Sequence, residues 1–97
     1  MKFYHGTSQK SWEEIQKDGE LYGYDRIWSN DRKTILHEHR VTYLATEREE
    51  AACYGDVVLE VEYDPYRSDA QCNHFEDGCW QIRVYEPISL SHIKRIQ

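Results

Sequence analysis

The stretch Phe3-Tyr4-His5-Gly6-Thr7-Ser8 lies where an apolar run at the start of the chain gives way to polar residues. The apolar residues from Met1 to Tyr4 predict a β-strand that stops at His5. The glycine and the two hydroxyl residues that follow form a polar connection to the next element. We therefore expect the chain to open with a strand that has a histidine at its end.

A helix is expected soon after this connection. Ser11 and Glu14 are three residues apart, and side chains with this spacing can satisfy the free N–H groups of a helix N-terminus. Trp12 and Ile15 would then share one face, and Gly19 would end the helix in the left-handed conformation. Residues 20–40 are polar and aromatic without a clear period, which predicts either a lid over a cleft or a loop pinned by its own aromatic side chains.

The central part of the chain predicts a second strand and a second helix. Val41 to Ala45 is a β-type run, and Thr46 and Glu49 repeat the capping pair before a helix that would end at Gly55. Alternation then predicts a strand from Val57 to Tyr63, with every second side chain facing inward. The inward residues are expected to be Leu59, Val61 and Tyr63.

The last third of the chain predicts a polar loop over residues 66–79 and a strand over residues 80–85. In that strand Trp80, Ile82 and Val84 should point inward, with Gln81, Arg83 and Tyr85 on the opposite face. Residues 86–96 predict a turn that leads into an edge strand. The mixed order of strands and helices predicts an α+β fold, with a small, split, largely antiparallel β-sheet and short helices.

Composition limits the class of protein. The 97 residues fit a single domain over 1–97, and a formal charge of −6 disfavours a nucleic-acid partner. The chain has no run of eighteen apolar residues and no apolar stretch of signal-peptide length at its start, so we expect a cytoplasmic protein without a membrane segment. Its three cysteines fit reduced thiols, with a disulfide between Cys72 and Cys79 as the alternative.

Four segments occur in an order that resembles the ADP-ribosyltransferases. They are the opening stretch 3–8, the first helix with its terminal glycine, Thr42-Tyr43-Leu44-Ala45, and Ala51-Ala52-Cys53-Tyr54-Gly55. The chain is similar to the branch with a His-Tyr-Glu triad, which contains the poly-ADP-ribose polymerases and the rifampin ADP-ribosyltransferases. The resemblance runs from Phe3 to Ile96 and implies that NAD binds as a substrate in an open cleft.

The resemblance implies a role for each matching residue. His5 would hydrogen-bond the 2′-hydroxyl of the adenosine ribose, and Gly6 and Thr7 would continue the nucleotide site. The Gly6 backbone would pair with the nicotinamide amide, since a side chain would block this approach. Tyr43 would stack on the nicotinamide ring, and Tyr54 would close its other side. Each residue alone also fits a structural role, and only their order favours the nucleotide site.

The sequence departs from the family at the third triad position. The family's glutamate holds the nicotinamide ribose and stabilises positive charge, whereas the corresponding strand here offers Gln81. An amide can hold a hydroxyl but supplies no negative charge, and such electrostatic stabilisation is often worth about 3 kcal/mol. Glu76 and Asp77 in the preceding loop are the alternative source of a carboxylate, or else solvated loop residues.

The resemblance therefore implies a mono-ADP-ribosyltransferase, a glycosyl-transferring enzyme that passes ADP-ribose from NAD to a protein or small-molecule acceptor. An RNA 2′-phosphotransferase, which shares the fold and uses NAD, is the alternative, and His5 and Arg40 match its need for phosphate-binding residues. A second alternative is a weakly catalytic module that binds NAD or ADP-ribose and acts through a protein partner. The pairs His37/His39 and Cys72/His74 lack the repeated spacing of a zinc site, so no metal is expected.

Overall fold

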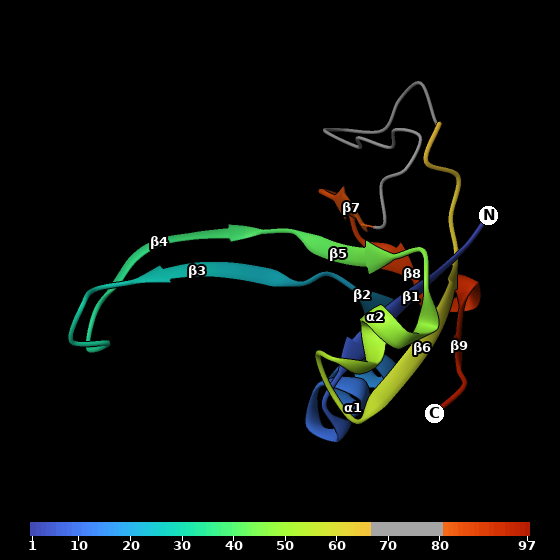
Figure 1. Cartoon of the computed structure of the whole chain (residues 1–97), viewed down its shortest axis with the longest axis horizontal. Coiled ribbons are helices and arrows are strands. Elements are labelled where there is room, and N and C mark those ends of the chain that lie inside the picture. Colours follow the sequence, from blue (N-terminus) through green and yellow to red (C-terminus); the bar gives the residue numbers. More distant parts are fainter. Residues whose placement is uncertain (67–80) are drawn as a thin grey trace.

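A computed structural model describes residues 1–66 and 81–97, apart from the side chains of residues 25–27 (Figure 1). Within these residues the chain forms a mostly antiparallel β-structure with two short helices. In chain order the elements are β1 (Lys2–Thr7), α1 (Gln9–Asp18), β2 (Glu20–Leu21), β3 (Tyr24–Trp28), β4 (Ile35–Arg40), β5 (Thr42–Ala45), α2 (Arg48–Ala52), β6 (Val57–Glu62), β7 (Gln81–Val84), β8 (Ile88–Ser89), a 3₁₀ turn (Leu90–His92) and β9 (Ile93–Arg95).

The main sheet has five strands in the order β7-β5-β1-β6-β9, and each adjacent pair is antiparallel. This arrangement confirms the α+β class and the largely antiparallel sheet, and β9 confirms the predicted edge strand. The opening strand β1 pairs with β6 along its whole length, from Lys2 opposite Glu62 to Thr7 opposite Val57. Because β6 supplies this continuous partner, β1 extends to Thr7, and the prediction that it stops at His5 is wrong.

Pairing between β1 and β5 is limited to a single position, Tyr4 opposite Ala45. On its other side β5 pairs with β7 over all four residues, from Thr42 opposite Val84 to Ala45 opposite Gln81. The sheet therefore has its least backbone pairing in the middle, between two well-paired halves.

The two faces of the sheet bury different side chains. The alternation predicted for β6 and β7 is confirmed, since Leu59, Val61 and Tyr63 are buried with Ile82 and Val84. Trp12 and Ile15 share one face of α1 as predicted, and they pack in the same core cluster, while Trp80 lies outside the described residues. The opposite face carries a smaller cluster beneath α2, made of Ala45, Ala51 and Val58.

Both predicted helix starts are wrong, although the predicted end of α1 is confirmed. Ser8, rather than Ser11, caps α1, because its extended backbone lets its hydroxyl accept a 3.1 Å hydrogen bond from the Ser11 N–H. Gly19 ends α1 with a φ of 75°. The N-cap of α2 is Glu47, one residue after Thr46, and the Glu47 side chain makes no capping hydrogen bond.

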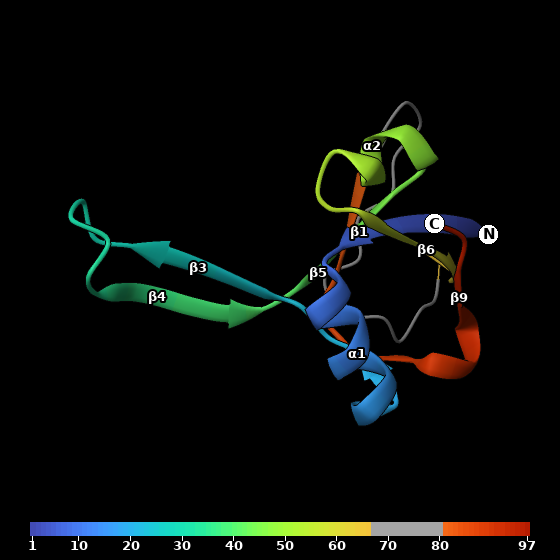
Figure 2. The ribbon, with the colours of Figure 1, turned by 90° about the horizontal axis from the view of Figure 1, so that it is seen from below.

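Residues 20–40 are largely β-structure, so the prediction of an irregular stretch is wrong. Strands β3 and β4 form an antiparallel hairpin that projects away from the rest of the molecule in both views (Figures 1 and 2). We call β3, β4 and the connecting residues 29–34 the arm. The sequence did not predict these strands, because a hairpin that packs on no core needs no apolar face. Its residues therefore show no hydrophobic period.

Gly6 allows α2 to pack directly on β1. A Cβ atom at this position would lie 1.8 Å from the carbonyl oxygen of Ala51, which is a backbone atom and has little freedom to move away. The close approach that Gly6 permits is therefore made by the protein itself, between a strand and a helix.

We predict that Gly6→Ala lowers the free energy of unfolding by roughly 1–3 kcal/mol, because α2 must shift to make room for the methyl group. Gly19→Ala is the matched control. Its methyl group would meet no atom within 4 Å, and the positive φ alone should cost about 1 kcal/mol. Urea unfolding of both variants measures the difference, and a Gly6→Ala protein as stable as the wild type would contradict the packing argument.

Candidate functional site

An open cavity of about 310 Å³ lies on the face of the sheet that α2 covers. Four elements or their flanking residues contribute to it: β1, β5, α2 and β7. Five of the residues expected at the nucleotide site lie together here, and three others complete the lining. The lining residues are Tyr4, His5, Gly6, Tyr43, Ala45, Ala51, Tyr54 and Gln81. We call this space the first cavity.

His5 spans the poorly paired part of the sheet. Its Nδ1 lies 2.9 Å from the backbone oxygen of Tyr43, so the histidine of β1 is bonded to β5 just beyond the single paired position. A carbonyl can only accept, and Nδ1 therefore carries the proton. Burial of the ring lowers the pKa of His5 and outweighs the opposing effect of this hydrogen bond. At neutral pH the ring is uncharged, and its Nε2 is an acceptor suited to a ligand hydroxyl.

The two tyrosines give the first cavity its aromatic walls. Tyr43 is half-buried in β5, whereas Tyr54 follows α2 and is 66% exposed. Because Tyr54 belongs to the turn after the helix, its side chain forms an exposed part of the cavity wall. Aromatic walls on a shallow space suit a flat ring, which can bury its faces without filling a deep pocket.

Gln81 is the first residue of β7 and lies opposite Ala45 in the sheet. Its half-buried side chain lines the first cavity, so the structure brings the amide into the group of residues expected from the sequence. Among the described residues that line this cavity there is no aspartate or glutamate. The alternative carboxylates, Glu76 and Asp77, lie outside the described residues.

A second cavity of about 620 Å³ adjoins the first, because His5 and Tyr43 line both. Thr7, the remaining expected site residue, lines this second cavity and not the first. Its other walls come from α1, β2 and the base of the arm, and they include three carboxylates and one guanidinium. These charged residues are Glu14, Asp18, Glu20 and Arg40.

Arg40 is held in a defined position in the second cavity. Its guanidinium carbon lies 4.3 Å from the ring centre of Tyr22 and 4.2 Å from that of Tyr24. The guanidinium also donates a 3.0 Å hydrogen bond to the Tyr24 hydroxyl and a second hydrogen bond to the Tyr22 carbonyl. Two aromatic faces and two acceptors thus fix a planar fork of donors, a geometry suited to an anion such as phosphate.

The sequence did not indicate every residue of the two cavities. Tyr4 lies in the recognised opening stretch, yet nothing in the sequence distinguishes it as a wall residue. Ala45 and Ala51 line the first cavity because their small side chains leave space between β5 and α2. Tyr24 lies opposite Arg40 in the β3–β4 hairpin, and the hydrogen bonds of Gly23 with Val41 and Thr42 hold Tyr22 beside it. A sequence pattern does not contain these contacts.

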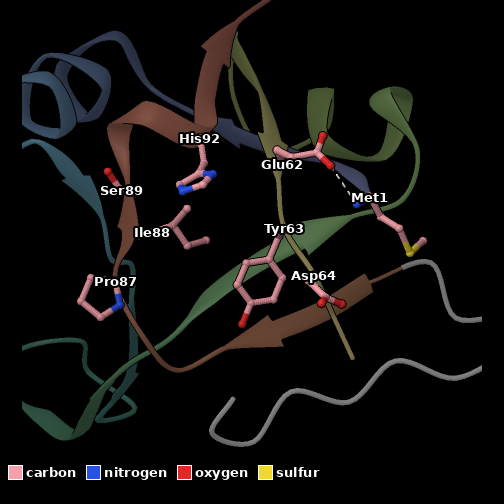
Figure 3. Close-up of a pocket in the computed structure, with 8 residues that line it drawn as sticks. All are labelled: Met1, Glu62, Tyr63, Asp64, Pro87, Ile88, Ser89 and His92. Carbon is pink, nitrogen blue, oxygen red and sulfur yellow. Dashed lines mark hydrogen bonds and ion pairs between the residues drawn. The ribbon is translucent and has the colours of Figure 1, made fainter. Parts of the chain in front are cut away.

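A third cavity, of about 440 Å³, lies between the end of β6 and the segment around β8 (Figure 3). The amino group of Met1 lies 2.9 Å from a Glu62 carboxylate oxygen at its edge, and Tyr63 and Ile88 line it from the core. None of the residues expected at a nucleotide site is among its lining residues. It is therefore separate from the two cavities that share His5.

No group of three or more potential metal ligands occurs among the residues that the structure describes. The rings of His37 and His39 contact each other on the arm with centroids 5.1 Å apart, while Cys72 and His74 lie outside the described residues. Within the same described part of the chain, no helix is long and apolar enough to cross a membrane.

Fold and site together define a mostly antiparallel α+β protein. Its first cavity, with aromatic walls, lies where β1 and β5 pair at one position only, and its second cavity, with charged walls, adjoins the first. Comparison of the chain with protein-family models, with curated proteins and with solved structures found no match.

The lowered pKa of His5 predicts a pH dependence of stability. In the unfolded chain this imidazole takes up a proton near its ordinary pKa of 6.5, whereas the folded protein keeps it neutral to lower pH. The unfolded state then binds more protons, so the free energy of unfolding should fall as the pH is lowered from 7 through 6.5.

His5→Asn is the variant that isolates this effect, because an asparagine amide can still donate to the Tyr43 carbonyl but does not titrate. Urea unfolding at pH 7 and at pH 5 should give a smaller loss of stability in His5→Asn than in the wild type. Other titrating groups are common to both proteins and cancel in the comparison. An equal loss in the two proteins would mean that burial does not lower the pKa of His5.

Proposed function

We propose that the chain is an NAD-dependent mono-ADP-ribosyltransferase with an ADP-ribosyltransferase-like fold. The observation that carries the proposal is the convergence of His5, Tyr43 and Gln81 on one cavity, from strands that are far apart in the sequence. These are the residues that the sequence resemblance assigns to an NAD site. Gly6 and Tyr54 line the same cavity, as that assignment requires.

In the proposed reaction a nucleophile of the acceptor attacks C1′ of the nicotinamide ribose. The bond between C1′ and the nicotinamide nitrogen breaks, and nicotinamide leaves with the electron pair of that bond, which neutralises its ring. A hydroxyl or amine nucleophile then loses its proton to solvent. Tyr43 and Tyr54 would hold the nicotinamide ring, and the Gln81 amide would hold a hydroxyl of the ribose.

In this proposal the second cavity would take the ADP half of the same ligand. The fixed guanidinium of Arg40 offers charge-assisted hydrogen bonds to a pyrophosphate. The carboxylates of Glu14, Asp18 and Glu20 are acceptors, and an adenosine presents hydroxyl and amino donors to them. His5 lies in the shared wall, where its Nε2 would accept from a ribose hydroxyl between the two halves of the dinucleotide.

Gln81 also favours a second candidate, a module that binds NAD or ADP-ribose with little catalysis. Without a carboxylate among the described residues of the first cavity, positive charge on the ribose would lack its usual partner. An RNA 2′-phosphotransferase is less well supported, because Arg40 is the one lysine or arginine among the described residues that line the two cavities. Strong binding of an RNA backbone draws on several such cations.

We expect the purified protein to bind NAD and, with an acceptor present, to release nicotinamide and add the mass of one ADP-ribose to the acceptor. Amide NMR separates the two cavities. Nicotinamide alone should shift signals near Tyr43 and Tyr54, whereas ADP-ribose should shift signals near Thr7 and Arg40. Mass spectrometry of the acceptor completes the test, and a protein that binds no NAD at millimolar concentration would exclude the proposed function.

Gln81→Glu distinguishes the enzyme from the binding module. A carboxylate in the first cavity should stabilise positive charge on the ribose, so we expect NAD hydrolysis to rise by roughly 10²-fold, equivalent to about 3 kcal/mol. Gln16→Glu is the matched control, because it makes the same change from amide to carboxylate at an exposed position of α1 that lines none of the three cavities. If Gln81→Glu binds NAD normally but hydrolyses it no faster than the control, the binding module is the better description.

A further inference from the structure

The arm carries exposed apolar side chains that no other part of the described chain covers. The exposed fractions are 44% for Trp28, 40% for Ile35 and 66% for Leu36. Leu36 lies at an irregularity in the hairpin, since Trp28 pairs with Ile35 and Ile27 pairs with His37, which leaves Leu36 without an opposite residue in β3. A two-stranded hairpin is only marginally stable in water by itself, and uncovered apolar side chains on one indicate an interaction surface.

Hydrogen bonds at both ends hold the shape of the arm. At the tip, Ser29 and Thr34 are joined by two hydrogen bonds of 2.8 and 3.2 Å, and the Asp31 carboxylate accepts from the Ser29 hydroxyl and the Lys33 N–H. At the base, Gly23 receives a 3.1 Å hydrogen bond from Val41 and donates one of 2.9 Å to Thr42. These contacts preorganise the arm, which lowers the entropic cost of binding a partner.

The charge of the arm differs in sign from that of the rest of the chain. Residues 24–40 contain four lysines and arginines against three aspartates and glutamates, together with two histidines, whereas the remaining residues contain eight against fifteen. At the tip, Arg32 and Lys33 are both exposed, and they precede Ile35 and Leu36 closely in the sequence. A partner of the arm should thus combine negative charge with apolar groups, while the acidic remainder of the chain disfavours a nucleic acid.

We propose that the arm is the docking surface for an acidic polypeptide segment with apolar side chains, which belongs to the acceptor. This inference rests on the proposed transferase function. The base of the arm carries Tyr24 and Arg40, which line the second cavity, so a segment bound along the arm would reach that cavity. The two strands form a separate two-stranded sheet, and an extended segment can add to the edge of such a sheet by backbone hydrogen bonds.

The test uses the full chain and two synthetic peptides, one of alternating Glu and Val and one of alternating Lys and Val. Amide NMR at low salt should show binding of the Glu peptide, with shifts confined to residues 24–40, and no binding of the Lys peptide. Arg32→Glu with Lys33→Glu should weaken the Glu peptide at least tenfold, and Leu36→Ser should weaken it also. Lys10→Glu with Lys17→Glu is the control, because it makes the same change of charge on α1, away from the arm.

NAD binding is measured in the same samples and should be unchanged in the arm variants, since neither Arg32 nor Lys33 lines a cavity. A chain that binds no NAD would overturn the proposed function and, with it, the acceptor role of the arm. A chain that binds NAD but not the Glu peptide, or binds both peptides equally, would overturn this inference alone. Two further outcomes would also overturn it. One is a dimer, seen by analytical ultracentrifugation, that the arm variants abolish; the other is binding of an oligonucleotide, but not of the Glu peptide, that the same variants abolish.

Discussion

The hydrogen bond from the His5 ring to the Tyr43 carbonyl links β1 and β5, where the main sheet has its least backbone pairing. Strands β1 and β5 pair at one position only, and beyond it a side chain supplies the contact that a backbone ladder would otherwise make. The first cavity lies on one face of the sheet at this position, while the core on the opposite face stays buried. The same bond fixes the proton on Nδ1, so that the geometry of the sheet and the chemistry of Nε2 have one origin.

Gly6 connects this part of the sheet to the helix that covers it. The Ala51 carbonyl occupies the place of a side chain, which brings α2 and the following Tyr54 close to the strand that carries His5. The sequence resemblance explained this glycine by the approach of a ligand, whereas the structure explains it by the approach of a helix. The two explanations are compatible, because Gly6 lines the first cavity together with Ala51 and Tyr54. A strand without a side chain at this position leaves room both for the helix and for the cavity.

Much of the fold followed from local pattern. Alternation in β6 and β7 identified the buried side chains correctly, since burial on one face of a strand leaves a period of two in the sequence. The helix starts were placed wrongly for two reasons: Ser8 and Ser11 both offer a cap for α1, and α2 starts from Glu47, whose side chain makes no capping hydrogen bond. Only the backbone conformation decides where each helix begins. The arm was missed for a different reason, which is that its strands pack on each other and leave no apolar period.

The sequence by itself determined the types of residue available to the site and the class of the fold. His5, Tyr43 and Gln81 could be selected from their order along the chain, but their convergence depends on pairing between strands distant in sequence. Only the tertiary structure decided that Thr7 and Arg40 belong to a second cavity and that the arm projects away from the rest of the molecule (Figure 2). Residue order encodes local conformation directly, whereas a cavity arises where strands stop pairing, and that depends on the packing of the whole chain.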